Sequence, residues 1–94
     1  AIEWAPDGIR VNAVLPGAVD TAMLLNGSAG GERNHANRRS IIEALAEKTV
    51  MGRIGQPEEL ASGICFLLDN SESSYVTGSE LVVDGGAAAR LSTE

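Results

Sequence analysis

The chain has 94 residues, 44% hydrophobic and 21% charged, so it can form at most one small folded domain and is neither disordered nor fibrous. Seven Lys and Arg against thirteen Asp and Glu give a net charge of -6, which would repel nucleic acid and anionic membrane surfaces. No apolar run approaches the roughly 20 residues of a transmembrane helix, so we expect neither a nucleic-acid partner nor a membrane span.

The first residues and the cysteine content bear on the cellular setting. The chain starts Ala-Ile-Glu-Trp, without a basic or apolar leader, which favours a cytoplasmic protein as the default expectation. The single cysteine, Cys65, can form neither an internal disulfide nor a thiolate metal site. Its place in an apolar helical pattern predicts a small core residue, and we expect no metal site.

The first third of the chain predicts a helix end and a strand. Residues 1–5 are typical of a last helical turn, because Gly8 follows closely and can take the left-handed conformation that ends helices. Residues 9–15 are rich in branched side chains and stop at Pro16 and Gly17, which predicts a largely buried strand.

A loop and a helix are predicted next. Residues 26–37 are rich in Gly, Ser and Asn and predict a mobile loop. Residues 41–48 predict a helix, because Ser40 and Glu43 have the spacing of a capping box and apolar residues follow at helical spacing.

Residues 57–68 predict a second, better delimited helix. Pro57 suits its first position and two glutamates follow at the positive end of the dipole. Asp69 and Asn70 should end it. Its apolar stripe, expected to face a sheet or a sister subunit, consists of Leu60, Ile64, Leu67 and Leu68.

Residues 80–84 predict a second strand, so the order is strand, helix, strand. Such a βαβ unit requires parallel strands. Parallel strands are stable in larger sheets covered on both faces, and two strands cannot supply one. The sequence therefore predicts an α/β protein that is a piece of a larger domain or folds against another chain.

Four segments in register resemble the C-terminal part of short-chain dehydrogenases/reductases, in the subset that includes 3-oxoacyl-carrier-protein reductases and glucose-dehydrogenase-like enzymes. They are residues 3–17 (EWAPDGIRVNAVLPG, with Thr21 beyond), 52–61 (GRIGQPEELA), 74–78 (SYVTG) and 81–86 (LVVDGG). The resemblance implies the C-terminal portion of a Rossmann-type doubly wound parallel sheet: helix end, strand, lid helices, helix, strand. Residues 1–94 would form one incomplete segment of that domain, with a substrate lid at about residues 22–50.

The resemblance also implies NAD or NADP as cofactor and a small carbonyl or alcohol compound as substrate. Pro16, Gly17, the Val19 backbone and the Thr21 hydroxyl would lie beside the nicotinamide. This position is physically sensible, because open α/β sheets bind ligands outside the carboxyl ends of their strands. Thr21 has a second interpretation: with Asp20 it could cap a short helix over residues 23–25.

The family's catalytic signatures are absent from this sequence. There is no Thr-Gly-x-x-x-Gly-x-Gly turn, and the only tyrosine, Tyr75, has Ser79 four residues later where the family's lysine would stand. We therefore assign no catalytic residue, and expect the cofactor to be held mainly by a part outside this chain. The chain alone should not turn over.

Other polar residues have simpler interpretations. Asn12, within a strand, needs a hydrogen-bond partner and is predicted to be structural. A hydrolase triad around His35 is disfavoured, since no Gly-x-Ser-x-Gly elbow exists. A basic cluster could meet a substrate phosphate or carboxylate, or be the solvated face of a lid; it comprises Arg33, His35, Arg38 and Arg39.

Two hypotheses remain from the sequence. In the first, the chain is a segment of an oxidoreductase, which forms a homo-oligomer or associates with an N-terminal part. In the second, it is a non-catalytic truncated paralogue that only binds related subunits, through residues 57–68 and 80–86.

Overall fold

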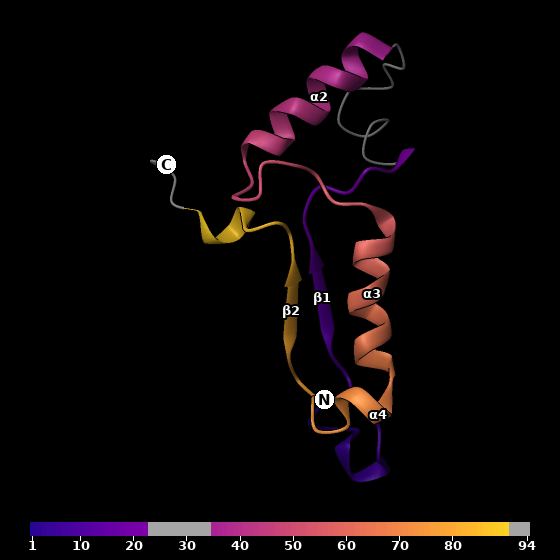
Figure 1. Cartoon of the computed structure of the whole chain (residues 1–94). Coiled ribbons are helices and arrows are strands. Elements are labelled where there is room, and N and C mark those ends of the chain that lie inside the picture. The colour runs from indigo at the N-terminus through magenta and orange to yellow at the C-terminus, as the bar shows by residue number, and fades with distance from the viewer. Residues whose placement is uncertain (23–34, 91–94) are drawn as a thin grey trace.

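The structure, a computed structural model, describes residues 1–22 and 35–90, the side chains of residues 35–37 excepted. Its elements follow one another in the predicted order (Figure 1). They are η1 (Ala5–Asp7), β1 (Ala13–Pro16), α2 (His35–Glu47), α3 (Pro57–Leu68), α4 (Asn70–Ser73), β2 (Glu80–Val83) and η2 (Ala87–Ala89).

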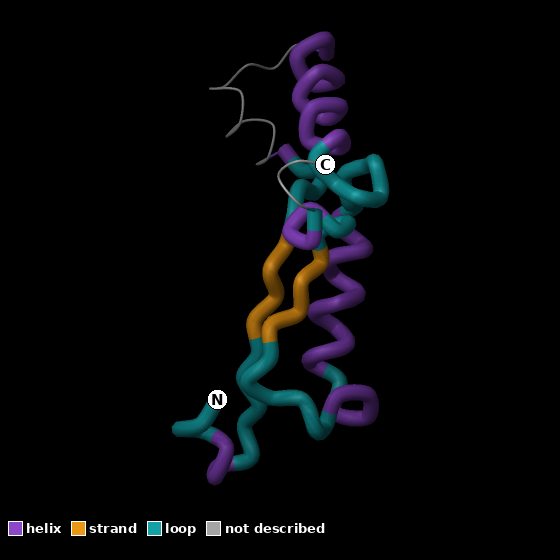
Figure 2. Tube along the Cα trace, turned by 90° about the vertical axis from the view of Figure 1, so that its left-hand side faces the viewer, coloured by secondary structure: helices purple, strands orange, loops and turns teal. Residues whose placement is uncertain are grey.

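Strands β1 and β2 pair in parallel, as the βαβ pattern predicts. The register runs from Ala13 opposite Glu80 to Pro16 opposite Val83. Helix α3 packs along one face of this pair, and no other described helix packs on the opposite face (Figure 2). The fold class is therefore confirmed as α/β with a parallel two-stranded sheet.

Strand β1 is shorter than the predicted 9–15 and begins only at Ala13. Before β1, the Asn12 side chain bonds to the backbone of the neighbouring segment. Its side-chain amide donates to the Val76 carbonyl at 3.0 Å, and its side-chain oxygen accepts from Ser79 N–H at 2.9 Å. These bonds hold residues 9–12 beside the turn before β2 without strand geometry. Asn12 is structural, as predicted. Strand β2 likewise ends one residue early, at Val83.

Helix α3 begins and ends where the sequence predicts. Pro57 lies in its first turn, and Glu59 accepts a hydrogen bond from the Gln56 N–H at 3.0 Å, which satisfies a free amide at the helix start. A side chain at Gly63 would reach to 3.3 Å from the Leu81 and Val83 side chains, so the helix lies close against the sheet there. The short helix α4, which follows at once, was not predicted.

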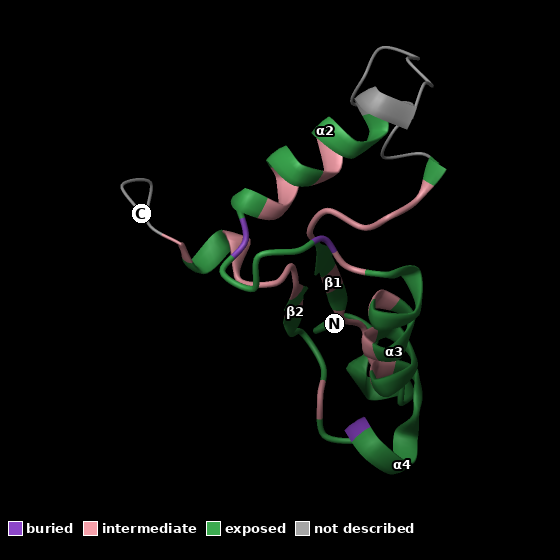
Figure 3. Cartoon of the chain, turned by 45° about the horizontal axis from the view of Figure 1, so that its top comes forward, coloured by how far each residue is buried: buried purple, intermediate pink, exposed green. Residues whose placement is uncertain are grey.

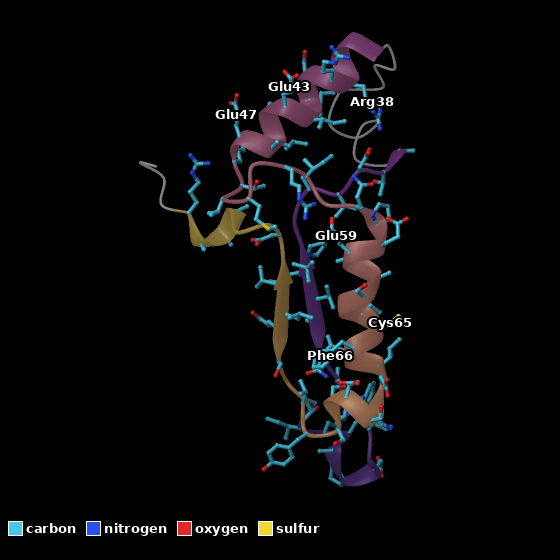
Figure 4. The ribbon with its side chains drawn as sticks, viewed as in Figure 1. Arg38, Glu43, Glu47, Glu59, Cys65 and Phe66 are labelled. Atoms are coloured by element: carbon cyan, nitrogen blue, oxygen red, sulfur yellow. The ribbon has the colours of Figure 1, made fainter. Side chains whose placement is uncertain are left out.

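The apolar stripe of α3 is only partly covered. Leu60 and Leu67 are half-buried on the sheet side, whereas Ile64 is 41% and Leu68 is 75% exposed, so these two do not pack on the sheet within this chain. Cys65 is exposed as well, so its prediction as a core residue is wrong for this chain. Two residues from Gly63, it lies on the opposite side of the helix and points away from the strands (Figure 4).

Helix α2 begins earlier than predicted, at His35 rather than residue 41, so Ser40 lies inside the helix and caps nothing. The predicted loop 26–37 is thus helical from His35, and its residues 26–34 lie outside the described part. Polar helix formers such as Arg38 and Arg39 extend the helix without any apolar periodicity that would reveal it.

The N-terminal residues form a single tight turn rather than a regular helix end. Ala5 N–H donates to the Ala1 carbonyl at 3.0 Å, and the chain continues as the short 3-10 helix η1. Gly8 follows at φ 76°, the left-handed conformation predicted for it.

Very little of the described chain is buried. Only Ile54, Thr49 and Ser73 have lost nearly all their solvent contact (Figure 3). On the sheet face away from α3, Leu15 and Val82 lie opposite each other, and 39% and 49% of their surfaces are exposed. The sheet is therefore covered on one side only. No helix within residues 1–22 and 35–90 is long and apolar enough to cross a membrane.

Candidate functional site

A cleft of about 440 Å³ lies at the carboxyl ends of the two strands. It is formed where three segments meet: the residues after β1, the residues leading into α3, and the turn after β2. Lining side chains and backbone include Val19, Met51, Gly55, Leu60, Asp84 and Gly86. This is the edge at which open α/β sheets bind their ligands.

Pro16 and Gly17 bring the chain to this edge. Pro16 is the last residue of β1, and Gly17 N–H donates to the Val83 carbonyl at 3.0 Å. A Cβ on Gly17 would be 2.7 Å from the Asp84 Cβ and 2.8 Å from the Asp84 Cα. The glycine is thus required by the close approach of the neighbouring strand end.

Val19 is fixed by an isolated parallel bridge to Gly55. Gly55 N–H donates to the Ala18 carbonyl, and Asp20 N–H donates to the Gly55 carbonyl, both at 2.9 Å. In a parallel bridge of this kind the N–H and C=O of the central residue project to the opposite side. The amide and carbonyl of Val19 therefore point away from Gly55.

Thr21 lies two residues further on and is half-buried. The short helix that it was predicted to cap, residues 23–25, lies outside the described residues. Asp20 accepts an ion-paired hydrogen bond from Arg38 of α2, with 2.8 Å between Oδ1 and Nη2. Pro16, Gly17, Val19 and Thr21 thus follow one another along a single segment at the carboxyl edge.

Arg53 and Glu59 form one wall of the cleft. The guanidinium and the carboxylate meet through two parallel bonds of 2.8 Å each, Nη1 to Oε1 and Nη2 to Oε2. The bond from Arg53, with the bond from Gln56 N–H, lowers the pKa of Glu59 from 4.5 to about 2. The bidentate pair holds the start of α3 against the segment that precedes it.

Thr49 organises the segment between α2 and Arg53. Its buried hydroxyl lies within 2.9 Å of the Ala46 carbonyl and 3.1 Å of the Arg53 carbonyl, and it accepts from the N–H groups of Gly52 and Arg53. One side chain thereby ends α2 and fixes the turn that leads to the Arg53 wall.

Asp84 organises the turn after β2. Its carboxylate accepts from Gly86 N–H at 2.8 Å and from Ala88 N–H at 2.9 Å. Gly85 and Gly86 have φ values of 63° and 90°, and a Cβ on Gly86 would lie 2.8 Å from the Val50 Cβ. Gly86 is therefore needed for the close approach of this turn to Val50, and Gly85 for its left-handed backbone conformation.

Three of these residues, Arg53, Thr49 and Asp84, were not singled out by sequence analysis. The spacing of Gln56 and Glu59 is that of a capping box at the start of α3, but it does not indicate Arg53 as the partner of Glu59. For Asp84 a signal was present, because an Asp before two glycines is typical of a turn. The hydroxyl of Thr49 carries no comparable local signal, since its role depends on four backbone groups that only the turn brings together.

The remaining candidates do not join the site. Tyr75 is fully exposed and follows α4, at the end of the sheet opposite the cleft. Of the basic cluster, Arg38 is paired with Asp20, Arg39 is exposed, and Arg33 and the His35 side chain lie outside the described residues. Within the described residues no three His, Cys, Asp or Glu side chains gather as a metal site would require.

Comparison with known proteins shows which family this sequence is similar to. The family described as enoyl-(acyl carrier protein) reductase matches residues 1–88. A short-chain dehydrogenase/reductase, bsc3 of Alternaria brassicicola, is 38% identical over 94 residues, which cover all of this chain and 32% of that protein. Galactitol 2-dehydrogenase (L-tagatose-forming) of Cereibacter sphaeroides is 43% identical over 86 residues, 92% of this chain and 30% of that protein.

Solved structures agree with these relatives. The ligand-free aldohexose dehydrogenase of Thermoplasma acidophilum superposes with a TM-score of 0.85 at 35% identity, covering 98% of this chain and 36% of that one. A short-chain dehydrogenase/reductase from Caenorhabditis elegans, solved with cofactor, gives 0.82 at 35% identity, covering 98% and 34%.

The chain spans about a third of the length of these relatives, and the matched part is their C-terminal portion. The family assignment rests on the match to nearly the whole chain and on the parallel βαβ unit that the structure contains. This chain belongs to the short-chain dehydrogenases/reductases, a family of NAD(P)-dependent oxidoreductases, and corresponds to their C-terminal portion.

Proposed function

We propose that this chain is the C-terminal segment of an NAD(P)-dependent oxidoreductase that acts on a small carbonyl or alcohol compound. Residues 1–94 form part of one Rossmann-type domain, with the lid at about residues 22–50. Pro16, Gly17, Val19 and Thr21 form one flank of the nicotinamide pocket.

The observation that carries this proposal is the orientation of Val19. Its bridge to Gly55 turns its own N–H and C=O outward at the carboxyl edge, and no hydrogen bond from a described residue occupies them. A carboxamide presents one donor and one acceptor, so it complements this backbone pair. The Thr21 hydroxyl, two residues along, can both donate and accept.

When bound, the nicotinamide would supply or accept the hydride. The part of this chain is to hold and orient the carboxamide on one side, while the lid excludes water from the reacting groups. We expect the proton donor to come from elsewhere in the enzyme, because Tyr75 lies between α4 and the start of β2, whereas the cleft lies at the carboxyl end of β2.

The relatives support the substrate class. One is named a galactitol 2-dehydrogenase and another an aldohexose dehydrogenase, both names for proteins that oxidise sugar alcohols or sugars. For this chain we propose only the shared chemistry, an alcohol or its carbonyl counterpart.

The exposed apolar surfaces support a partner. Leu15 and Val82 on the open sheet face would be covered by the N-terminal part of the enzyme. Phe66 and Leu68 on α3, 41% and 75% exposed, would be covered by that part or by a second subunit.

Thr21→Val in the intact enzyme tests the cofactor role. The substitution keeps the shape and removes one hydrogen bond, worth roughly 0.5 to 1.5 kcal/mol. We expect the dissociation constant for NAD(P)H, measured by fluorescence titration, to rise about threefold to tenfold. Thr21→Ser is the control, because serine keeps the hydroxyl and should bind the cofactor normally.

If Thr21→Val leaves cofactor affinity unchanged and lowers the melting temperature, Thr21 only caps the helix after it and leaves the pocket. If the intact protein binds neither NADH nor NADPH, the chain is a non-catalytic paralogue that serves as an association partner.

A further inference from the structure

Helix α2, the main element of the proposed lid, is attached to the described part of the molecule in an unusual way. It lies beyond the carboxyl edge of the sheet and packs against none of the other described helices or strands (Figure 1). Among the described residues, it is held by the segment at its C-terminal end and by the Arg38 side chain.

The C-terminal end of α2 is firmly tied. Thr49 N–H donates to the Ala46 carbonyl at 3.1 Å, and the Thr49 hydroxyl joins the same carbonyl to the following turn. Arg90, after η2, donates to the Glu47 carbonyl and, at 3.4 Å, to the Thr49 carbonyl. Met51 N–H donates to the Gly85 carbonyl at 3.0 Å. These bonds fix the C-terminal end of α2.

Near the other end of α2, the Arg38 side chain reaches the site. Arg38 pairs with Asp20 at 2.8 Å, with 47% and 26% of the two side chains exposed. Nine residues of helix separate Arg38 from Glu47, so the Arg38 backbone lies about 14 Å from the tied end of α2. Glu43 and Glu47 point to the outer side of α2, whereas Arg38 extends toward the segment after β1 (Figure 4).

Asp20 itself is held in place by the site. Its N–H donates to the Gly55 carbonyl, and it lies between Val19 and Thr21 in the sequence. The Arg38–Asp20 ion pair therefore joins the lid helix to the segment proposed to contact the nicotinamide.

We propose that Arg38 is a positioning residue: through Asp20 it holds the N-terminal half of the lid helix α2 over the cofactor segment, while the bonds around Thr49 and Arg90 hold the C-terminal end of α2. This rests on the proposed function, because it takes helix α2 as part of the substrate lid. Its action is on the substrate and not on the hydride step: a lid held in register lowers the Michaelis constant.

Kinetics of the intact enzyme test the proposal with a double-mutant cycle. We expect Arg38→Gln and Asp20→Asn each to raise the KM for the carbonyl substrate about two- to fivefold, with little change in kcat. The double variant should be no worse than either single one, because the two side chains act as a pair. Arg38→Lys should recover part of the loss.

Salt dependence and a matched control sharpen this test. Salt screens a partly exposed pair, so the wild-type KM should rise with ionic strength and that of Arg38→Gln should not. Arg39→Gln, the adjacent residue on the same helix, should behave like wild type. An Arg38→Gln enzyme with unchanged KM, or additive effects of Arg38 and Asp20, would overturn the proposal.

A distance measurement gives a readout that does not depend on activity. Spin labels on Cys65 and on Glu43→Cys, with other cysteines replaced by serine, report the position of α2 relative to α3. Arg38→Gln should broaden the distance distribution and Arg39→Gln should not. If the distance distribution of Arg38→Gln equals that of wild type, the positioning role of Arg38 is refuted, even if Thr21→Val confirms the cofactor pocket. Conversely, a broadened distribution would support it even if Thr21 proves to be only a helix cap.

Discussion

Gly17 illustrates how a residue in the proposed pocket can be required by the fold. The end of β2 comes so close that a Cβ on Gly17 would stand 2.7 Å from the Asp84 Cβ and 2.8 Å from the Asp84 Cα. Because part of this obstacle is backbone, a rotamer change alone cannot relieve it. The glycine thus allows the two strand ends to meet at the cleft.

Gly17→Ala in the intact enzyme should consequently lower the free energy of unfolding by about 1 to 3 kcal/mol, the usual cost of overpacking. Chemical denaturation measures this loss. Gly55→Ala is the matched control, since a Cβ there would meet its nearest neighbour at an ordinary 3.7 Å. A loss at Gly17 no larger than at Gly55 would contradict the strand-contact argument.

Glu59 gives the cleft a measurable acid sensitivity. Its bonds from Arg53 and Gln56 lower its pKa to about 2 in the folded protein, against an ordinary value of 4.5. The folded state therefore holds the charged form, and this stabilisation is complete above pH 4.5 and is lost as the pH falls toward 2.

In Glu59→Gln the melting temperature should fall less between pH 5 and about pH 3 than in wild type. Glu58→Gln, on the same turn, leaves the Arg53 pair intact and should show the wild-type slope. If the melting temperatures of Glu59→Gln and wild type fall equally over this pH range, the Arg53–Glu59 pair contributes nothing to stability.

At the scale of elements, α3 carries two kinds of apolar surface. Leu60 and Leu67 face the sheet beside Gly63, whereas Leu68 and Cys65 face outward. A single helical stripe in the sequence is thus divided between intramolecular packing and a surface left for another partner.

Leu67→Ala and Leu68→Ala separate these surfaces in the intact enzyme. Leu67 is half-buried in this chain, and where the rest of the enzyme completes its burial Leu67→Ala should cost roughly 2 to 5 kcal/mol at any protein concentration. The cost of Leu68→Ala should depend on concentration if a second subunit covers it, and be constant if the N-terminal part does. A negligible cost for both would mean that the helix face is misassigned.

At the scale of the whole molecule, the chain is more extended than a compact domain of its length. The radius of gyration is 16.4 Å, whereas a compact domain of this length has about 12 Å. With one face of the sheet open and three nearly buried residues, the described chain lacks the core of an independent domain.

The isolated 94-residue chain should therefore show no NAD(P)H-dependent carbonyl reduction, because the Tyr-x-x-x-Lys pair and the glycine-rich turn are both missing. Spectrophotometric assay at 340 nm, with the intact enzyme as positive control, tests this. Sustained turnover by the chain alone would disprove it.

The sequence by itself determined the family, the order of the elements, and the position of α3, because these depend on local signals: Pro57 at a helix start, Gly8 in a left-handed turn, and motifs in register. It also predicted that Asn12 is structural. The tertiary structure alone decided which face of α3 is covered, why Gly17 must be glycine, and that Arg38 meets Asp20. Each of these depends on contacts between residues distant in the chain, which periodicity and capping signals do not encode.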